Sequence, residues 1–217
     1  MDVVIYGAGG LIGSQLTREA IQRGHEVAAV LRDPSRAPDI DGQVEVIAGD
    51  VLDTEAVGAL ARGRDAMVSA VGAGLHGPDP VFEVYRRAAE SLVTALRAHG
   101  ETAPRLLVVG GAGSLEVAPG VRLVDTSDFP EMFRTEALAQ AEALEFFRNV
   151  TDVAWTYISP AALIQPGDRT GRYRTGGDTL ITDEQGNSAI SIEDYAAVFV
   201  DELEAPTAIG RRLAVAY

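Results

Sequence analysis

The sequence predicts an α/β protein in which helices cover both faces of one parallel sheet, the doubly wound arrangement. Three observations predict this fold. Short apolar runs alternate with amphipathic segments from residue 2 to residue 158. A glycine-rich turn joins the first run to the first amphipathic segment. The length is 217 residues, of which 47 % are hydrophobic, so we expect one domain with a substantial core over residues 1–217.

Six apolar runs are the expected strands of the sheet. They comprise residues 2–6, 26–31, 44–47, 66–71, 105–109 and 153–158. Because helical segments separate most of these runs, the strands should pair in parallel and be buried on both sides.

The expected helices carry apolar side chains at intervals of three and four residues. They comprise residues 11–23, 54–61, 81–99 and a segment that Asp128 and Pro130 open. We expect Thr54 to cap the second helix. The inner faces should include Leu11 in the first helix and Phe133 in the fourth.

The regular alternation ends after Pro160, and we expect the tail to form a small lobe on the substrate side of the fold. The tail should hold a loop, two short strands around a turn, a helix and a final strand. The corresponding residues are 165–178, 180–182, 188–192, 193–203 and 212–215.

Four glycines in the first thirteen residues predict a dinucleotide site of the Rossmann type. They stand between a buried-type strand and a helix, where glycine permits a tight turn and a close approach of the backbone to phosphate. The amides at the beginning of the helix would then bind the diphosphate. A merely structural turn is the alternative. The expected contacts are Gly7, Gly9, Gly10, Leu11, Ile12 and Gly13.

The residues after the second strand indicate which dinucleotide binds. Arg32 lies about where a dinucleotide site carries its discriminating side chain, and Arg36 follows closely. A guanidinium can bind the 2′-phosphate of NADP(H) through two hydrogen bonds and stack on adenine. We therefore favour NADP(H) over NAD(H). The alternatives are that Arg32 is a solvated surface residue or that Asp33 binds the ribose of NAD(H).

Two further strand ends are expected to complete the cofactor site. Asp50 and Val51 should frame the adenine ring, unless Asp50 only caps the turn that follows it. Small residues at the carboxyl end of the fourth strand, Ala70, Val71 and Gly72, leave room for ribose and nicotinamide.

Two residues are candidates for catalysis. Ser114 follows the fifth strand and would stand beside the nicotinamide, where it can hydrogen-bond a carbonyl oxygen, or it only satisfies a local turn. His76 can donate a proton near neutral pH, or it is an exposed loop histidine. The remaining histidines lack metal-ligand spacing, so we expect no metal site.

These motifs resemble the short-chain dehydrogenase/reductase superfamily, in its atypical, NmrA-like branch, over nearly the whole chain. The matching strings are GAGGLIG at 7–13, LRDP at 31–34, GD at 49–50, VGGAGSL at 109–115, DFPE at 128–131, WTYISPA at 155–161 and ISIEDYA at 190–196. Within the branch the chain is similar to bacterial NADH-flavin reductases. The resemblance implies that Pro160 lies close to the nicotinamide.

The chain departs from the superfamily at its catalytic pair. Most members carry Tyr-x-x-x-Lys, whereas the corresponding positions here are Phe133 and Ala137. Hydride transfer to a flavin ring mainly requires that two rings be aligned, and it does not depend on that pair.

We therefore expect an NAD(P)H-dependent oxidoreductase that passes hydride from NADPH to a flavin (FMN, FAD or riboflavin) or a quinone-like acceptor. The alternatives are a non-catalytic NADP(H)-binding redox sensor and a sugar-nucleotide epimerase or dehydratase.

The glycine-rich loop of the tail offers candidate substrate contacts. Arg169 and Arg172 could bind an anionic substrate such as a flavin phosphate, and Tyr173 could stack on its ring. Ion pairs with surface carboxylates are the alternative reading of the arginines.

Composition bounds the partners and the compartment. A net charge of −14 disfavours nucleic acid, and no run approaches the roughly 18 apolar residues of a membrane span. No signal peptide is visible and there is no cysteine, which suits the cytoplasm. We expect a small-molecule substrate and a monomer or homodimer.

Overall fold

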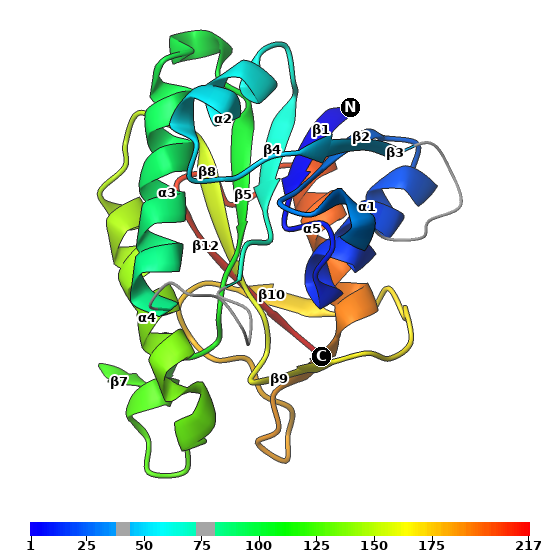
Figure 1. The fold of residues 1–217 in the computed structure, drawn as a ribbon. Helices are drawn as coiled ribbons and strands as arrows, with labels where there is room; N and C mark the ends of the chain where they lie inside the picture. Colours follow the sequence, from blue (N-terminus) through cyan, green and yellow to red (C-terminus); the bar gives the residue numbers. More distant parts are fainter. Residues whose placement is uncertain (38–43, 73–80) are drawn as a thin grey trace.

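A computed structural model describes residues 1–37, 44–72 and 81–217, and it contains one eight-stranded sheet (Figure 1). The strand order is β10-β12-β8-β5-β4-β1-β2-β3. Every neighbouring pair is parallel except β10 with β12. The chain winds outward from β1 in both directions, so the predicted doubly wound α/β fold is confirmed.

The sheet and its helices follow the predicted order. The strands of the sheet are β1 (Asp2–Tyr6), β2 (Glu26–Leu31), β3 (Val44–Ala48), β4 (Ala66–Ser69), β5 (Arg105–Val109), β8 (Trp155–Ser159), β10 (Arg174–Gly176) and β12 (Arg211–Ala216). The helices are α1 (Leu11–Gln22), α2 (Thr54–Ala61), α3 (Val81–Arg97), α4 (Glu131–Arg148) and α5 (Ile192–Glu204).

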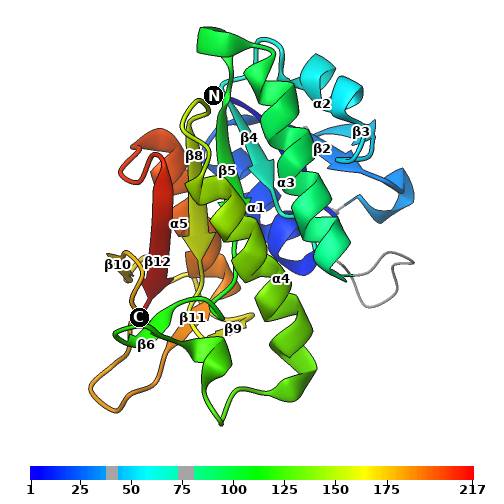
Figure 2. The ribbon, with the colours of Figure 1, turned by 90° about the vertical axis from the view of Figure 1, so that its left-hand side faces the viewer.

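Two hydrophobic cores lie on opposite faces of the sheet. Helices α1 and α5 cover one face, and α2, α3 and α4 cover the other (Figure 2). Successive side chains of a strand point to opposite faces, so Val3 and Ile5 of β1 join the first core, whereas Val4 and Tyr6 join the second.

Three predictions at the helix beginnings are wrong. Asp53 rather than Thr54 caps α2, because its carboxylate accepts the amide of Ala56 at 3.0 Å. Leu11 is 67 % exposed and Phe133 is 52 % exposed, although both were expected on inner faces. Each lies in the first turn of its helix, before the residues that pack on the strands.

The C-terminal segment differs from the prediction in its strand pairing. The second expected strand is β11 (Ala189–Ser191), and it pairs in parallel with β9 (Leu163–Gln165). Residues 180–182 form no strand, and the expected loop at 165–178 contains β10. The predicted turn forms, with the amide of Asp183 donating to the carbonyl of Asn187 at 2.8 Å. The segment therefore completes the main sheet through β12 and β10.

A short hairpin was not predicted. It consists of β6 (Glu116–Ala118) and β7 (Val121–Arg122), which pair antiparallel between β5 and α4. Among the described helices, none is both long and apolar enough to span a bilayer.

Candidate functional site

The turn after β1 and the first turn of α1 pack so closely that each contains a position that accepts only glycine. Gly7 has a φ of +79°, and a Cβ atom there would lie 2.4 Å from the carbonyl oxygen of Ala70. A Cβ atom at Gly13 would lie 2.1 Å from the carbonyl oxygen of Gly7. The glycines thus bring the first turn of α1 and the end of β4 together.

The beginning of α1 has no side-chain cap. Gly10 is the N-cap and supplies no side-chain acceptor, and the first turn of α1 contains no acidic residue. The first amides of a helix lack partners within the helix and carry partial positive charge. This end of α1 can therefore bind an anion such as a diphosphate.

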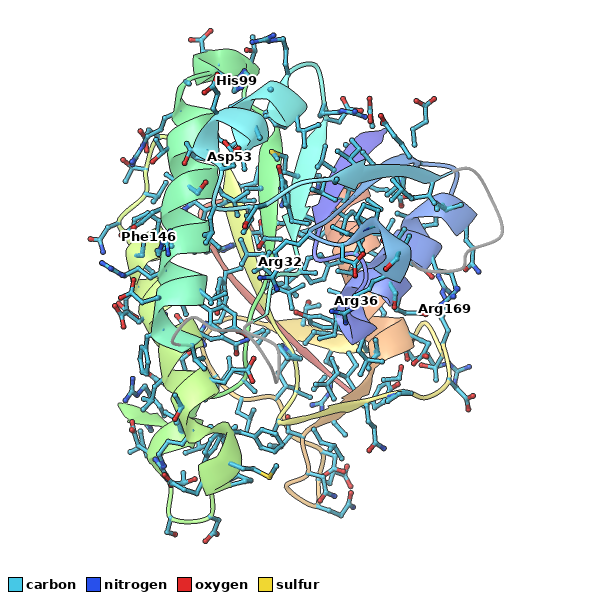
Figure 3. All side chains as sticks on the ribbon, viewed as in Figure 1. Arg32, Arg36, Asp53, His99, Phe146 and Arg169 are labelled. Carbon is cyan, nitrogen blue, oxygen red and sulfur yellow. The ribbon has the colours of Figure 1, made fainter. Side chains whose placement is uncertain are left out.

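Two arginines stand beside this turn. Arg32 and Arg36 are both exposed and lie near the centre of the view in Figure 3. A Cβ atom at Gly9 would lie 2.7 Å from the carbonyl oxygen of Arg36, so the two turns are in contact. Among the residues that the structure describes, neither guanidinium forms a hydrogen bond or an ion pair.

Asp33 differs from its arginine neighbours because the protein itself uses its carboxylate. One oxygen accepts the amide of Ser35 at 3.0 Å and the hydroxyl of Ser35 at 2.7 Å. These hydrogen bonds hold the pKa of Asp33 below its ordinary value. The carboxylate thereby caps the short 3₁₀ helix Pro34–Arg36.

The adenine candidates flank the end of β3. Asp50 is exposed and accepts the amide of Leu52 at 2.9 Å, which is the expected turn-capping alternative. Its second oxygen accepts no hydrogen bond from the part of the chain that the structure describes. Val51 is 7 % exposed and packs in the core beneath α2 and α3.

The end of β4 meets the glycine turn and α3. Ala70 adjoins Gly7, as the Cβ distance shows, and Val71 lies partly buried beside it. Gly72 is exposed, and a Cβ atom there would lie 3.7 Å from the hydroxyl of Tyr85. The sequence analysis did not identify Tyr85 as a candidate site residue. The only feature that could have indicated it is its position near the beginning of the helix that follows β4. His76 lies outside the described residues.

Ser114 is hydrogen-bonded to an arginine that the sequence reasoning missed. The Arg212 side chain donates to the Ser114 hydroxyl oxygen at 3.1 Å and pairs with Asp178 at 2.8 Å. Arg212 is 6 % exposed, and burial lowers its pKa while Asp178 opposes that effect. Its signal in the sequence is that it begins an expected strand, 212–215, whose other residues are apolar. The Arg212 bond leaves the Ser114 hydrogen available to a second acceptor.

Helix α4 packs tightly against the turn after β5. A Cβ atom at Gly113 would lie 2.6 Å from the Cβ of Ala137, and one at Gly111 would lie 1.8 Å from the amide oxygen of Gln140. The hydroxyl of Tyr157 in β8 donates to the Gln140 carbonyl at 2.9 Å. This face of α4 therefore borders the strand ends, with Ala137 in direct contact.

Two of the three tail residues interact with carboxylates of the protein itself. Arg169 forms a two-bond ion pair with Glu19 of α1 at 2.6 and 2.8 Å, and it lies at the outer edge of the view in Figure 3. The hydroxyl of Tyr173 donates to the carboxylate of Asp201 in α5. The ion pair of Arg169 matches the alternative reading of the arginines, and the expected substrate contacts of the two side chains stay predictions.

The remaining expected contacts have simpler surroundings. Arg172 is exposed, and Pro160 is buried directly after β8. His99 lies with its Nε2 2.8 Å from the carbonyl of Gly58, which joins α3 to α2. No group of three potential metal ligands is found among the residues that the structure describes.

Comparison with known proteins supports the nucleotide site. A family model described as NAD(P)H-binding matches residues 7–206. The chain is 39 % identical to the uncharacterized protein YwnB of Bacillus subtilis, over 99 % of this chain and 98 % of that one.

Two crystal structures share the fold and much of the sequence. A Burkholderia pseudomallei protein, provisionally labelled as exported, has a TM-score of 0.89 and 43 % identity, with all of both chains covered. A Streptococcus pneumoniae protein, provisionally labelled an NADH-flavin reductase, has a TM-score of 0.87 and 35 % identity, with 100 % of this chain and 99 % of that one covered. With its glycine turn and open helix N-terminus, this chain belongs to the NAD(P)H-binding family of Rossmann-fold proteins.

Proposed function

We propose that the protein is an NADPH-dependent reductase that passes hydride to a flavin or a quinone-like acceptor. The observation that carries the cofactor choice is the juxtaposition of an uncapped helix N-terminus with Arg32 and Arg36. The label of the pneumococcal relative supports the acceptor class. We also propose that the protein acts in the cytoplasm and that it is a monomer or a homodimer.

The residues of the site fit the parts of the cofactor. Gly7, Gly10 and the first amides of α1 would bind the diphosphate, and Arg32 would bind the 2′-phosphate. The adenine would lie against Asp50 and Val51. The bound cofactor would supply hydride above the carboxyl ends of β4 and β5. The remaining contacts there are Ala70, Val71, Gly72 and Pro160.

The state of Asp33 favours NADP(H) over NAD(H). An NAD site uses a carboxylate to accept the hydroxyls of the adenine ribose. The Asp33 carboxylate instead accepts two hydrogen bonds from Ser35. A phosphate placed beside Arg32 and Arg36 gains charge-assisted hydrogen bonds that a ribose hydroxyl does not.

The test combines binding with turnover. We expect calorimetry to show that NADP⁺ binds more tightly than NAD⁺, and that the R32Q variant loses most of that difference. We expect NADPH oxidation with riboflavin, FMN, FAD or a naphthoquinone to exceed the rate without protein. The absence of binding by either dinucleotide at millimolar concentration would overturn the cofactor site, and the absence of turnover on the whole panel would overturn the reductase.

A redox sensor is a second candidate, favoured by Phe133 and Ala137 at the positions of the usual catalytic pair. Such a protein would bind NADP⁺ and NADPH with different affinities and show no turnover. The same calorimetry with both redox forms therefore separates the two candidates.

A further inference from the structure

A tyrosine and a carboxylate from two different helices meet beside the strand ends. The hydroxyl of Tyr85 in α3 donates to the carboxylate of Glu136 in α4. The side-chain amide of Gln140 donates to the same hydroxyl at 3.3 Å. The two helices lie side by side on one face of the sheet (Figures 1 and 2).

The hydroxyl lies where ligands bind in open α/β sheets, outside the carboxyl ends of the strands. It is 3.7 Å from the position of a Cβ atom at Gly72, after β4. Gln140 contacts Gly111, after β5, so the cluster spans the two strand ends that border the proposed hydride position.

The exposure of the cluster suits proton transfer. Tyr85 is 8 % exposed and its ring packs against Ala139 and Ala143 of α4, which fixes the position of the hydroxyl. Glu136, which accepts from the hydroxyl, and Gly72, which lies near it, are both exposed. The hydroxyl is therefore close both to an exposed residue at the end of β4 and to a carboxylate that is in contact with solvent.

We propose that Tyr85 is the catalytic proton donor and that Glu136 resupplies its proton. This inference rests on the proposed reductase function. In the resting structure the Tyr85 hydrogen is directed to Glu136, so the hydroxyl must first turn that hydrogen toward the acceptor. As hydride reaches the acceptor, the O–H bond of Tyr85 breaks and a new O–H bond forms on an acceptor oxygen. Water then returns a proton to Tyr85 through Glu136. In sum, acceptor, NADPH and one proton give the reduced acceptor and NADP⁺.

The inference narrows the acceptor to one with a conjugated carbonyl oxygen, as in a quinone. Such an oxygen gains negative charge when hydride arrives, and a positioned proton donor neutralises it. A free flavin can take its proton from water, so its reduction should depend less on Tyr85.

The main test compares the Y85F and Y217F variants with the unchanged protein. The Tyr217 hydroxyl also donates to a carboxylate, that of Asp194 at 2.9 Å, but it lies outside the site. With menadione and NADPH we expect Y85F to lower kcat by about 100-fold, in the range of general acid catalysis. We expect Y217F to leave kcat unchanged, and E136Q to lower it less than Y85F does.

A second readout does not require turnover. In the complex with NADP⁺ no hydride is available, so menadione binding reports contacts alone. We expect Y85F to weaken that binding by about three- to tenfold, the effect of one lost hydrogen bond, with no change in NADP⁺ affinity or melting temperature.

The two readouts separate this inference from the reductase function. Equal menadione binding and turnover in Y85F and the unchanged protein would overturn the role of Tyr85, as would a protein that reduces flavins but neither binds nor reduces menadione. Loss of turnover on every acceptor would overturn the reductase, and weaker binding to Y85F would still support the Tyr85 contact.

Discussion

At the scale of single residues, the glycine turn illustrates how a backbone contact dictates a side chain. Gly7 and Gly24 both have positive φ values, +79° and +82°. Only at Gly7 would a Cβ atom meet another backbone atom, since nothing lies within 4 Å of the corresponding position at Gly24. Comparing substitutions at the two glycines therefore distinguishes the effect of a strained backbone conformation from the effect of a steric clash.

We predict that G7A is far more damaging than G24A. At Gly24, alanine should cost only the strain of positive φ, about 1–2 kcal/mol in the free energy of unfolding. At Gly7, the 2.4 Å approach to Ala70 adds a clash that must move the turn, so the loss should be larger and NADP⁺ binding should fall. Urea unfolding and calorimetry on both variants provide the measurement. Equal losses of stability, with NADP⁺ binding retained in G7A, would contradict the prediction.

Other residue-level predictions show where a sequence is and is not informative. The glycine turn and the arginines after β2 could be singled out because the features that mark them depend on neighbours in the chain. The Tyr85–Glu136 pair could not, since 51 residues separate its members and only the packing of α3 on α4 joins them. The partners of Arg169 and Tyr173, which are Glu19 and Asp201, could not be found for the same reason, since they lie far away in the sequence.

At the scale of elements, local signals fixed the types of helix and strand better than their exact ends and pairings. The expected strand at 105–109 has the bounds of β5, whereas the expected strand at 66–71 stops at Ser69. Strand β11 was predicted at the correct place but with the wrong partner. A turn favours pairing between the two segments that flank it, whereas β11 pairs in parallel with β9. The pairing of a strand depends on the other strands of the sheet, and the periodicity of one segment gives no information about them.

We predict that Asp53, and not Thr54, contributes the capping energy of α2. The D53A variant should lose about 1 kcal/mol in the free energy of unfolding, because the amide of Ala56 loses its acceptor. The D53S variant keeps a capping oxygen and should lose much less. Urea denaturation of the two variants tests the assignment, and indistinguishable losses would show that the carboxylate acts in another way.

At the scale of the whole molecule, buried carboxylates join the C-terminal segment to the rest of the fold. Glu202 of α5 is 2 % exposed, forms an ion pair with Arg105 of β5 and accepts the amide of Ala208 at 3.0 Å. Asp194 accepts the hydroxyl of Thr170 at 2.6 Å and the amide of Gly171 at 2.8 Å. The carboxylates thus hold α5 and the loop before β10 in place.

These contacts predict a loss of stability in acid. Burial raises the pKa of Glu202 and of Asp194, but the hydrogen bonds outweigh burial and leave each pKa below its ordinary value, 4.5 and 3.8 respectively. A group whose folded pKa is lowered stabilises the fold fully above its unfolded pKa, and that contribution disappears as the pH falls through the folded value. The free energy of unfolding should therefore be nearly constant above pH 5 with respect to these two groups and should fall steadily below pH 4.5.

The D194N variant isolates one of the two contributions. Asparagine does not ionise in this range, so the variant should be less stable than the unchanged protein at pH 7, and the difference should shrink as the pH falls and the native carboxylate becomes protonated. Urea unfolding at pH 7, 5, 4 and 3.5 measures both curves. A difference that stays constant across this range would show that Asp194 contributes through its shape and hydrogen bonds rather than through its charge, and the acid sensitivity of the fold would then have to come from other carboxylates.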